Sequence, residues 1–363
     1  MPLSILPSAS CRFDVVSLGE CMIRLSPPGH DRLESARQLE VFVGGGEYNV
    51  TYALARLGLR CSWIGGLVDN ALGRIVENHA RAAGLDTSHC VRMKYDGVGR
   101  EARIGLNFTE VGTSVRGSVT LYDRGYSATS RMKPGDVDLS RLFESERARW
   151  FHTGGIFTCL SKTTAELARA ALAAAKKGGA VVSYDLNFRS KLWTSELAIA
   201  TTRPLMPFVD CLIGNEEDFQ KVLGYPVEGA GESLRGLKVE SYQKMVRKVA
   251  RDFPNLALIG TTLREVRSGL VNDWSAILYS TAEDRFYLGP KYENLEIEDR
   301  VGGGDGFASG VIYGLLTGES LQRCVDLGTA HGALLQTTRG DTSQVTLPEL
   351  LHVAGGGGAR IQR

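Results

Sequence analysis

Hydrophobic and polar positions along this chain follow two patterns. Short apolar, β-branched runs predict buried strands, and apolar residues spaced three or four apart predict amphipathic helices. The expected strands lie at residues 14–18, 61–67, 150–152, 181–186, 211–213 and 256–259. The expected helices include residues 48–57, 71–83, 162–177 and 217–223. This alternation is typical of a mostly parallel sheet with helices on both faces, and it predicts an α/β fold.

Two stretches depart from the alternation. Residues 21–43 and 91–131 contain short alternating segments, with no helix between them. They predict a few antiparallel strands that project from the main sheet as a lid over one end, and the alternative is two long surface loops. We expect a single domain over residues 13–353. Residues 1–12 and the glycine-rich residues 354–363 are expected to form flexible tails.

Composition and charge narrow the functional classes. The 363 residues are 43% hydrophobic, and 42 Lys and Arg stand against 41 Asp and Glu, for a net charge of +1. This balance does not favour a nucleic-acid partner, so local geometry must hold any anionic ligand. Seven scattered cysteines without a CxxC pair favour reduced thiols over disulfides or a zinc site. No signal sequence or long apolar span is visible, which predicts a cytoplasmic protein without a membrane partner.

A glycine-rich turn near the C-terminus carries candidate chemistry. Gly302, Gly303 and Gly304 stand before Asp305, and a helical pattern follows. Free backbone N–H groups and the positive end of a helix dipole favour phosphate at such a turn. A carboxylate there, Asp305, can accept a proton from a hydroxyl that attacks phosphorus. The alternative is an ordinary helix start whose glycines allow close packing. No Lys-Ser/Thr follows, so this is not a P-loop.

A second glycine cluster adds a family resemblance. The run Gly44-Gly45-Gly46-Glu47-Tyr48-Asn49 resembles the first signature of the ribokinase-like (PfkB) carbohydrate kinases, and residues 299–306 resemble the second. The resemblance covers roughly residues 13–350. It implies a three-layer α/β sandwich with a mostly parallel central sheet and a small β lid. It also implies an ATP- and Mg²⁺-dependent kinase in which Asp305 is the catalytic base beside the glycine turn.

Within this family, one segment resembles the 2-keto-3-deoxygluconate kinases. It is Asp185-Leu186-Asn187-Phe188-Arg189, followed by Leu192-Trp193. In those enzymes the Arg helps to bind the acid end of the sugar, and the matching residue here is Arg189. The alternative is that Arg189 is a structural residue paired with Asp185. The other implied substrate contacts are Gly45, Asn49, Tyr122, Arg124 and Asp341. Because a sugar acid needs a cation, Arg124 and Arg189 favour an acid over a neutral hexose.

The resemblance also implies a nucleotide side. The cofactor contacts expected there are Asn187, Asn215, Thr261, Thr262, Leu263, Arg264 and Gly304. Asn215 and Asp218 resemble the family's Asn-x-x-Glu segment, which organises Mg²⁺ through water, with Asp in place of Glu. The alternative is an Asn that caps a helix whose first turn is acidic.

Several residues differ from those usual in the family, and these differences leave the identity of the sugar open. Arg300 stands where Thr is usual, Gly303 where Ala is usual, and Ile104 near the position where a second lid tyrosine is often found. We expect phosphorylation of a sugar acid, first of all 2-keto-3-deoxygluconate to its 6-phosphate. The alternatives are a kinase for a neutral sugar (fructokinase or ribokinase type) or a nucleoside, and a sugar-binding regulator without turnover. A homo-oligomer is implied by the resemblance alone.

Overall fold

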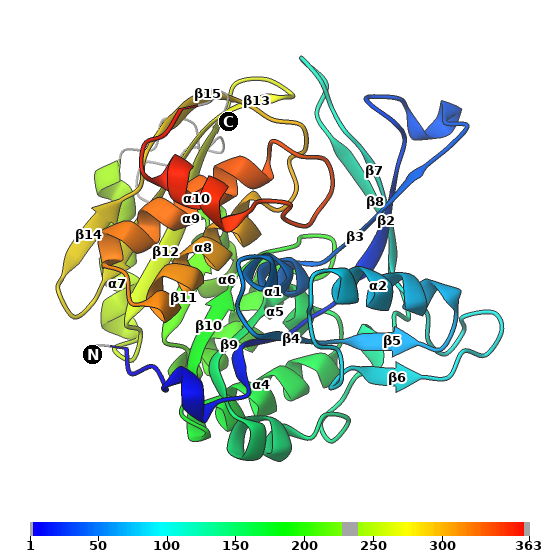
Figure 1. The fold of residues 1–363 in the computed structure, drawn as a ribbon, viewed down its shortest axis with the longest axis horizontal. Helices are drawn as coiled ribbons and strands as arrows, with labels where there is room; N and C mark the ends of the chain where they lie inside the picture. Colours follow the sequence, from blue (N-terminus) through cyan, green and yellow to red (C-terminus); the bar gives the residue numbers. More distant parts are fainter. Residues whose placement is uncertain (1–2, 227–238, 359–363) are drawn as a thin grey trace.

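The computed structural model describes residues 3–226 and 239–358. Within them, a nine-stranded sheet forms the centre of the molecule, in the order β14-β13-β12-β11-β10-β9-β1-β4, with β15 beside β13 (Figure 1). Neighbours from β4 to β12 are parallel, and β13, β14 and β15 are antiparallel additions. The strands are β1 (Phe13–Leu18), β4 (Cys61–Ile64), β9 (Ala148–Gly154), β10 (Val181–Asp185), β11 (Cys211–Gly214), β12 (Leu258–Val266), β13 (Val271–Ser280), β14 (Arg285–Leu288) and β15 (Tyr292–Glu296). The predicted α/β fold with a mostly parallel sheet is confirmed.

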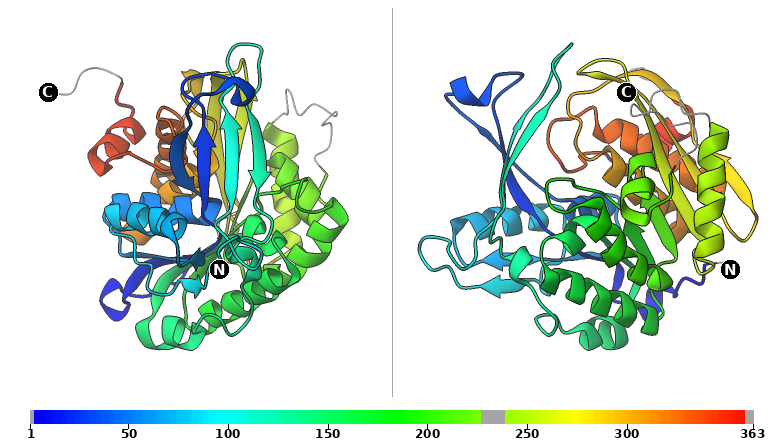
Figure 2. Two further views of the ribbon diagram at one scale, coloured as in Figure 1. Left: turned by 90° about the vertical axis from the view of Figure 1, so that its right-hand side faces the viewer. Right: turned by 180° about the vertical axis from the view of Figure 1, so that it is seen from behind.

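Helices cover both faces of this sheet. They are α1 (Gly46–Arg56), α2 (Ala71–Ala82), α3 (Gly155–Cys159), α4 (Lys162–Lys177), α5 (Ser195–Thr202), α6 (Glu216–Leu223), α7 (Val239–Asp252), α8 (Gly303–Thr317), α9 (Leu321–Leu335) and α10 (Leu347–Ala354). Seen from behind, α4 and α7 lie on the face opposite α8 and α9 (Figure 2). None of the described helices is both long and apolar enough to cross a membrane.

Each face of the sheet has its own hydrophobic core. In β1, Val16 belongs to the cluster under α4 and α7, whereas its neighbour Val15 belongs to the cluster under α1, α8 and α9. Phe151 and Trp150 divide in the same way in β9. Successive side chains of a strand point to opposite faces, so a sheet covered on both sides needs continuous apolar runs. This explains why the buried strands were visible in the sequence.

The lid is a separate four-stranded sheet that rises beside the body (Figure 1). Its order is β3-β2-β7-β8, with β2 (Met22–Ser26), β3 (Glu40–Gly44), β7 (Leu106–Glu110) and β8 (Val119–Asp123). The pair β2–β7 is parallel, so the prediction of an antiparallel lid is wrong for that pair. Strand β6 (Val91–Met93) pairs with β5 (Gly66–Val68) instead, which takes the start of the predicted lid segment out of the lid.

Other boundaries also differ from expectation. The predicted strand at 61–67 is two strands in different sheets, β4 and β5, which are separated by Gly65. A Cβ at Gly65 would lie 2.2 Å from the Trp63 ring. Part of the predicted N-terminal tail packs on the body: Arg60 donates hydrogen bonds to the carbonyls of Ser8 and Cys11, at 3.0 and 2.9 Å. Residues 359–363 of the predicted C-terminal tail lie outside the described residues.

Candidate active site

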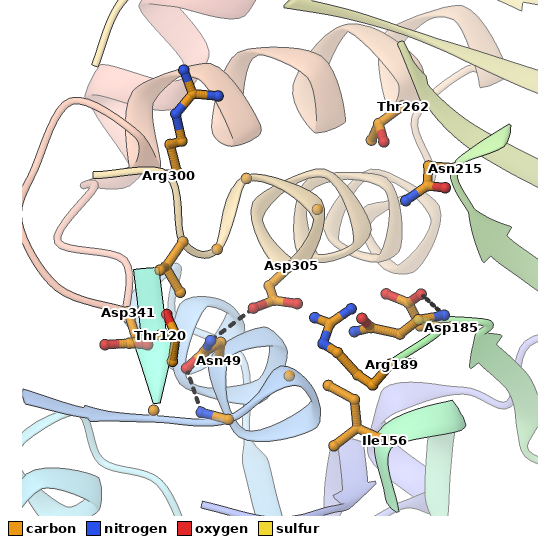
Figure 3. Close-up of a pocket in the computed structure, with 18 of the residues that line it drawn as sticks. Asn49, Thr120, Ile156, Asp185, Arg189, Asn215, Thr262, Arg300, Asp305 and Asp341 are labelled. Atoms are coloured by element: carbon orange, nitrogen blue, oxygen red, sulfur yellow. Dashed lines mark hydrogen bonds between the residues drawn. The ribbon is translucent and has the colours of Figure 1, made fainter. Parts of the chain in front are cut away.

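A cleft of about 510 Å³ lies between the lid and the carboxyl ends of the parallel strands. Parallel α/β sheets place their ligand sites at this edge, because strand ends and helix N-termini meet there. The cleft is lined by residues from the lid, from the ends of β10 and β11, from β12, and from the start of α8 (Figure 3). The predicted site residues that line it are Gly45, Asn49, Tyr122, Arg124, Asn187, Arg189, Asn215, Asp218, Thr262, Arg264, Gly302, Gly303, Gly304, Asp305 and Asp341.

Asp305 lies in the first turn of α8 and faces the cleft (Figure 3). Its Oδ2 accepts a hydrogen bond from Asn49 Nδ2 at 2.7 Å, and Asn49 Oδ1 accepts one from the Gly45 N–H at 3.1 Å. Only 9% of Asp305 is exposed. Burial raises its pKa from the ordinary 3.8 to about 7, against the lowering effects of the Asn49 hydrogen bond and the Arg189 charge. A carboxylate with a pKa near the working pH suits general-base catalysis.

The glycine turn has the conformation that an anion site requires. Gly302 caps α8 with φ of +86°, and a Cβ there would lie 2.5 Å from Leu335 Cδ2. Both facts call for glycine. At Gly303 a Cβ would meet the Gln336 amide at 3.0 Å, so the alanine usual in the family would need only a small shift of that side chain. At Gly304 no atom lies within 4 Å of a built Cβ, which leaves the turn open toward the cleft. The free N–H groups of the helix start can therefore reach an anion.

The two arginines predicted to bind the acid end of the substrate differ in their surroundings. Arg124 is buried and forms an ion pair with Glu20, which is 1% exposed and also accepts a hydrogen bond from Ser127. Its charge is therefore compensated within the protein. Among the described residues, Arg189 has no carboxylate within ion-pair distance, so the alternative pairing with Asp185 does not form; its Nη1 donates to the Phe188 carbonyl at 2.9 Å. Arg189 lies between Asp305 and Asp185 (Figure 3).

Asp341 is held by the lid. Arg24 of β2 contacts Asp341 Oδ2 through Nη1 at 3.3 Å and Asp299 Oδ2 through Nη2 at 2.5 Å. Burial raises the pKa of Asp341 to about 6. Arg24 thus connects the lid with the segment before the glycine turn. Tyr122 lines the cleft from β8, whereas Ile104 is 2% exposed and packs in the core instead of lining the cleft.

Strand alternation divides the predicted nucleotide contacts. On β12, Thr262 and Arg264 line the cleft, and Thr261 and Leu263 do not. Thr261 is 1% exposed, and Leu263 packs against the core on the opposite face of the sheet. Successive strand residues cannot point to the same side. The structure therefore removes the side chains of Thr261 and Leu263 from the predicted cofactor contacts.

Asn215 and Asp218 form a helix cap. Asn215 Oδ1 accepts the Asp218 N–H at 3.0 Å, and Asp218 Oδ2 accepts the Asn215 N–H at 2.9 Å, which is a capping box at the start of α6. Asp218 Oδ1 accepts the Phe188 N–H at 2.8 Å. The capping alternative is therefore realised. Within residues 3–226 and 239–358 no group of three His, Cys, Asp or Glu side chains is arranged to hold a metal directly.

The cleft also contains residues that the sequence reasoning did not assign. They are Met22, Gly44, Gly46, Asn107, Thr109, Thr120, Ile156, Asp185, Ile213, Gly214, Glu216, Glu217, Val266, Trp274, Arg300, Val301 and Gln336. Burial raises the pKa of Asp185 well above its ordinary value, and the charges of Asp218 and Asp305 raise it further. Its place at the end of β10 could have identified it, because ligands bind at strand ends. The lid residues Asn107 and Thr120 could not be found without the strand pairing.

These features define a carbohydrate kinase of one family. Residues 12–248 and 275–348 match the pfkB family carbohydrate kinase. The chain belongs to this family, as the two signatures predicted.

The chain is similar to several named members. It is 31% identical to the 2-dehydro-3-deoxygalactonokinase of Haloferax volcanii, over 96% of this chain and 99% of the relative. It is 25% identical to the 5-dehydro-2-deoxygluconokinase of Clostridium perfringens, over 89% of this chain and 87% of the relative. The crystal structure of a 2-dehydro-3-deoxygluconokinase from Thermotoga maritima superposes with a TM-score of 0.87 at 38% identity, over 94% of this chain and 99% of that chain. The predicted ribokinase-like fold is confirmed.

Proposed function

We propose that the protein transfers the γ-phosphoryl group of ATP to the primary hydroxyl of a dehydro-deoxy sugar acid, with 2-keto-3-deoxygluconate as the first substrate to test. The observation that carries the proposal is the geometry around Asp305. This buried carboxyl stands at a glycine-rich helix start and faces a cleft that also holds Arg189, an arginine without an ion-pair partner among the described residues.

The proposed chemistry assigns one task to each group. Asp305 accepts the proton of the hydroxyl, and the hydroxyl oxygen forms a bond to the γ-phosphorus. The bond from that phosphorus to the β–γ bridging oxygen breaks, and ADP leaves with its electron pair. Backbone N–H groups of the turn at Gly302 to Asp305 stabilise the charge on the transferring phosphoryl oxygens. ATP as phosphoryl donor agrees with the kinase family.

Magnesium fits the nucleotide side of this cleft. Asp185, Glu216 and Glu217 line it, and their oxygen atoms are the kind that Mg²⁺ prefers. Burial raises the pKa of Asp185 and of Glu216, and neighbouring carboxylates raise both further, so a cation bound nearby would favour their ionised forms. When bound, Mg²⁺ would neutralise charge on the ATP phosphates. Asn215 and Asp218 would contribute through water, because their direct contacts serve the helix cap.

Two observations support an acid over a neutral sugar. Relatives at 31% and 38% identity bear names that denote kinases of dehydro-deoxy sugar acids. Arg189 offers a cation without a carboxylate partner in the described structure, whereas the charge of Arg124 is already balanced by Glu20. The Nε of Arg124 is buried without a hydrogen-bond partner, so this donor remains available to a ligand oxygen.

ADP release with a panel of acceptors tests the proposal. The panel contains 2-keto-3-deoxygluconate, 2-keto-3-deoxygalactonate, 5-keto-2-deoxygluconate, fructose, ribose and a nucleoside, each with ATP and Mg²⁺. We expect the highest kcat/KM for one of the acids, and Asp305→Asn serves as the control for contaminating kinases. A neutral acceptor with the highest kcat/KM would refute the acid assignment. Saturable binding of a sugar without ADP release would favour a regulator instead.

We also propose that copies of the chain associate through the outer face of the lid. Val41, Val119 and Leu121 are 54, 46 and 54% exposed, and they alternate with the cleft-facing residues of β3 and β8. Light scattering checks the oligomeric state, and replacing Val41 and Leu121 with Ser should favour the monomer. A cytoplasmic location, which the scattered free cysteines favour, remains a prediction.

A further inference from the structure

Two hairpin tips meet above the cleft. One is the lid turn at residues 111–118, between β7 and β8, and the other is the turn at residues 267–270, between β12 and β13 (Figure 1). The Gly269 N–H donates a hydrogen bond to the Ser114 carbonyl at 2.6 Å. A Cβ on Gly269 would lie 2.7 Å from the Thr113 carbonyl carbon, so the two backbones are in direct contact. We name this the tip contact.

Arg300 supports the tip contact by hydrogen bonds to the turn at residues 267–270. Its Nε donates to the Gly269 carbonyl at 2.9 Å, and its Nη2 donates to the Ser268 carbonyl. Within the described residues no carboxylate pairs with Arg300, and burial together with the Arg264 charge lowers its pKa. A partly buried cation that donates to two carbonyls of one turn holds that turn in place. Arg300 extends away from Asp305 (Figure 3).

The residue before Arg300 reaches the lid as well. Asp299 forms the ion pair with Arg24 of β2, and its Oδ2 also accepts the Gly340 N–H at 3.3 Å. Asp299 and Arg300 therefore connect the start of the catalytic turn with the lid at two places. One is the strand β2, and the other is the hairpin tip at Ser114. Movement of the lid must act on the segment that places Asp305.

We propose that Arg300 is a positioning residue for phosphoryl transfer, which holds the 267–270 turn against the lid so that the cleft closes over both substrates. The inference rests on the proposed kinase function. A closed cleft excludes water and fixes the distance between acceptor and phosphoryl group, and a misplacement of about 1 Å can cost about 100-fold in rate. Arg300 acts through the turn at residues 267–270 and not by contact with the reacting atoms.

Two variants weaken the tip contact in different ways. Arg300→Met removes the donors and keeps the length, and Gly269→Ala separates the backbones at a residue that does not line the cleft. We expect each to lower kcat by about 10- to 100-fold, with little change in the KM for ATP, and to raise ATP hydrolysis without acceptor. The double variant should be no slower than the slower single variant, because both remove one contact. Arg300→Lys should restore part of the rate, and Arg285→Met on exposed β14 is the matched control.

Hydrogen–deuterium exchange gives a readout that does not depend on the acceptor. Both single variants should speed exchange in the lid at residues 106–123. If the wild type phosphorylates no acceptor but the variants still loosen the lid, the tip contact stands and the kinase assignment fails. If Arg300→Met leaves kcat and lid exchange unchanged, the positioning role is wrong. If it raises only the KM for ATP with unchanged exchange, Arg300 binds the nucleotide directly, which also overturns the proposal.

Discussion

Replacing Asp305 with Asn should make the protein more stable and almost inactive. The substitution conserves the shape of the side chain and removes only its charge. The amide oxygen introduced at this position can still accept the hydrogen bond that Asn49 donates to Asp305 Oδ2 at 2.7 Å, so the cleft should keep its geometry. An effect on rate can therefore be assigned to the lost base.

The structure sets the size of both effects. Loss of a positioned general base lowers the rate by about 100- to 10,000-fold. For stability, burial raises the pKa of Asp305 from 3.8 to about 7, so the folded state holds this proton over a range where the unfolded state has released it. The wild type therefore loses stability as the pH rises from about 4 to about 7. At about 1.4 kcal/mol per pH unit, the loss approaches about 4 kcal/mol, and the Asn variant avoids it.

Two assays check these effects. ADP release between pH 5 and 9 should show the wild-type kcat/KM rising to a plateau with a midpoint near pH 7, and the variant should lack this activity. Urea unfolding at pH 5 and pH 8 should show the stability advantage of the variant growing with pH. Near-wild-type turnover of the variant would refute the base assignment. A stability difference that does not grow with pH would refute the raised pKa.

Three further predictions use the same cleft. Asn49→Ala removes a hydrogen bond that favours the ionised form of Asp305, so the midpoint of the pH profile of kcat/KM should move above 7; an unchanged midpoint would contradict the contact. Gly302→Ala should abolish activity or soluble expression, because of φ +86° and the 2.5 Å approach to Leu335 Cδ2, whereas Gly303→Ala should stay within about tenfold of wild-type kcat. Arg189→Ala should raise the KM for the acid substrate by about 10-fold or more and leave the KM for neutral sugars nearly unchanged. Steady-state kinetics with both kinds of acceptor measure this difference, and an equal rise in both KM values would contradict the role of Arg189 in binding the acid.

The local elements and the motifs of the cleft could be predicted because their signals are local. Helix α4 (Lys162–Lys177) was predicted with its exact bounds, since the apolar spacing that indicates it lies within one segment; the structure adds a Ser161 cap at its start. The antiparallel strands β13 to β15 were not predicted, because they do not follow the strand–helix alternation. The side chains of Thr261 and Leu263 do not line the cleft, because strand residues alternate between the two faces of the sheet and a sequence motif does not show which face each residue takes.

By itself the sequence determined the fold class, the family and 15 of the 32 residues that line the cleft. Glycine clusters and strand ends can be recognised from a few neighbouring residues, so each indicates the same local structure wherever the segment packs. Only the tertiary structure decided the ionisation and the ion pairing of those side chains. Glu20 neutralises Arg124 across 104 positions of the chain, and Arg24 holds Asp341 across 317. A pKa or an ion pair depends on burial and on partners brought together by the whole fold, and the order of residues does not reveal them.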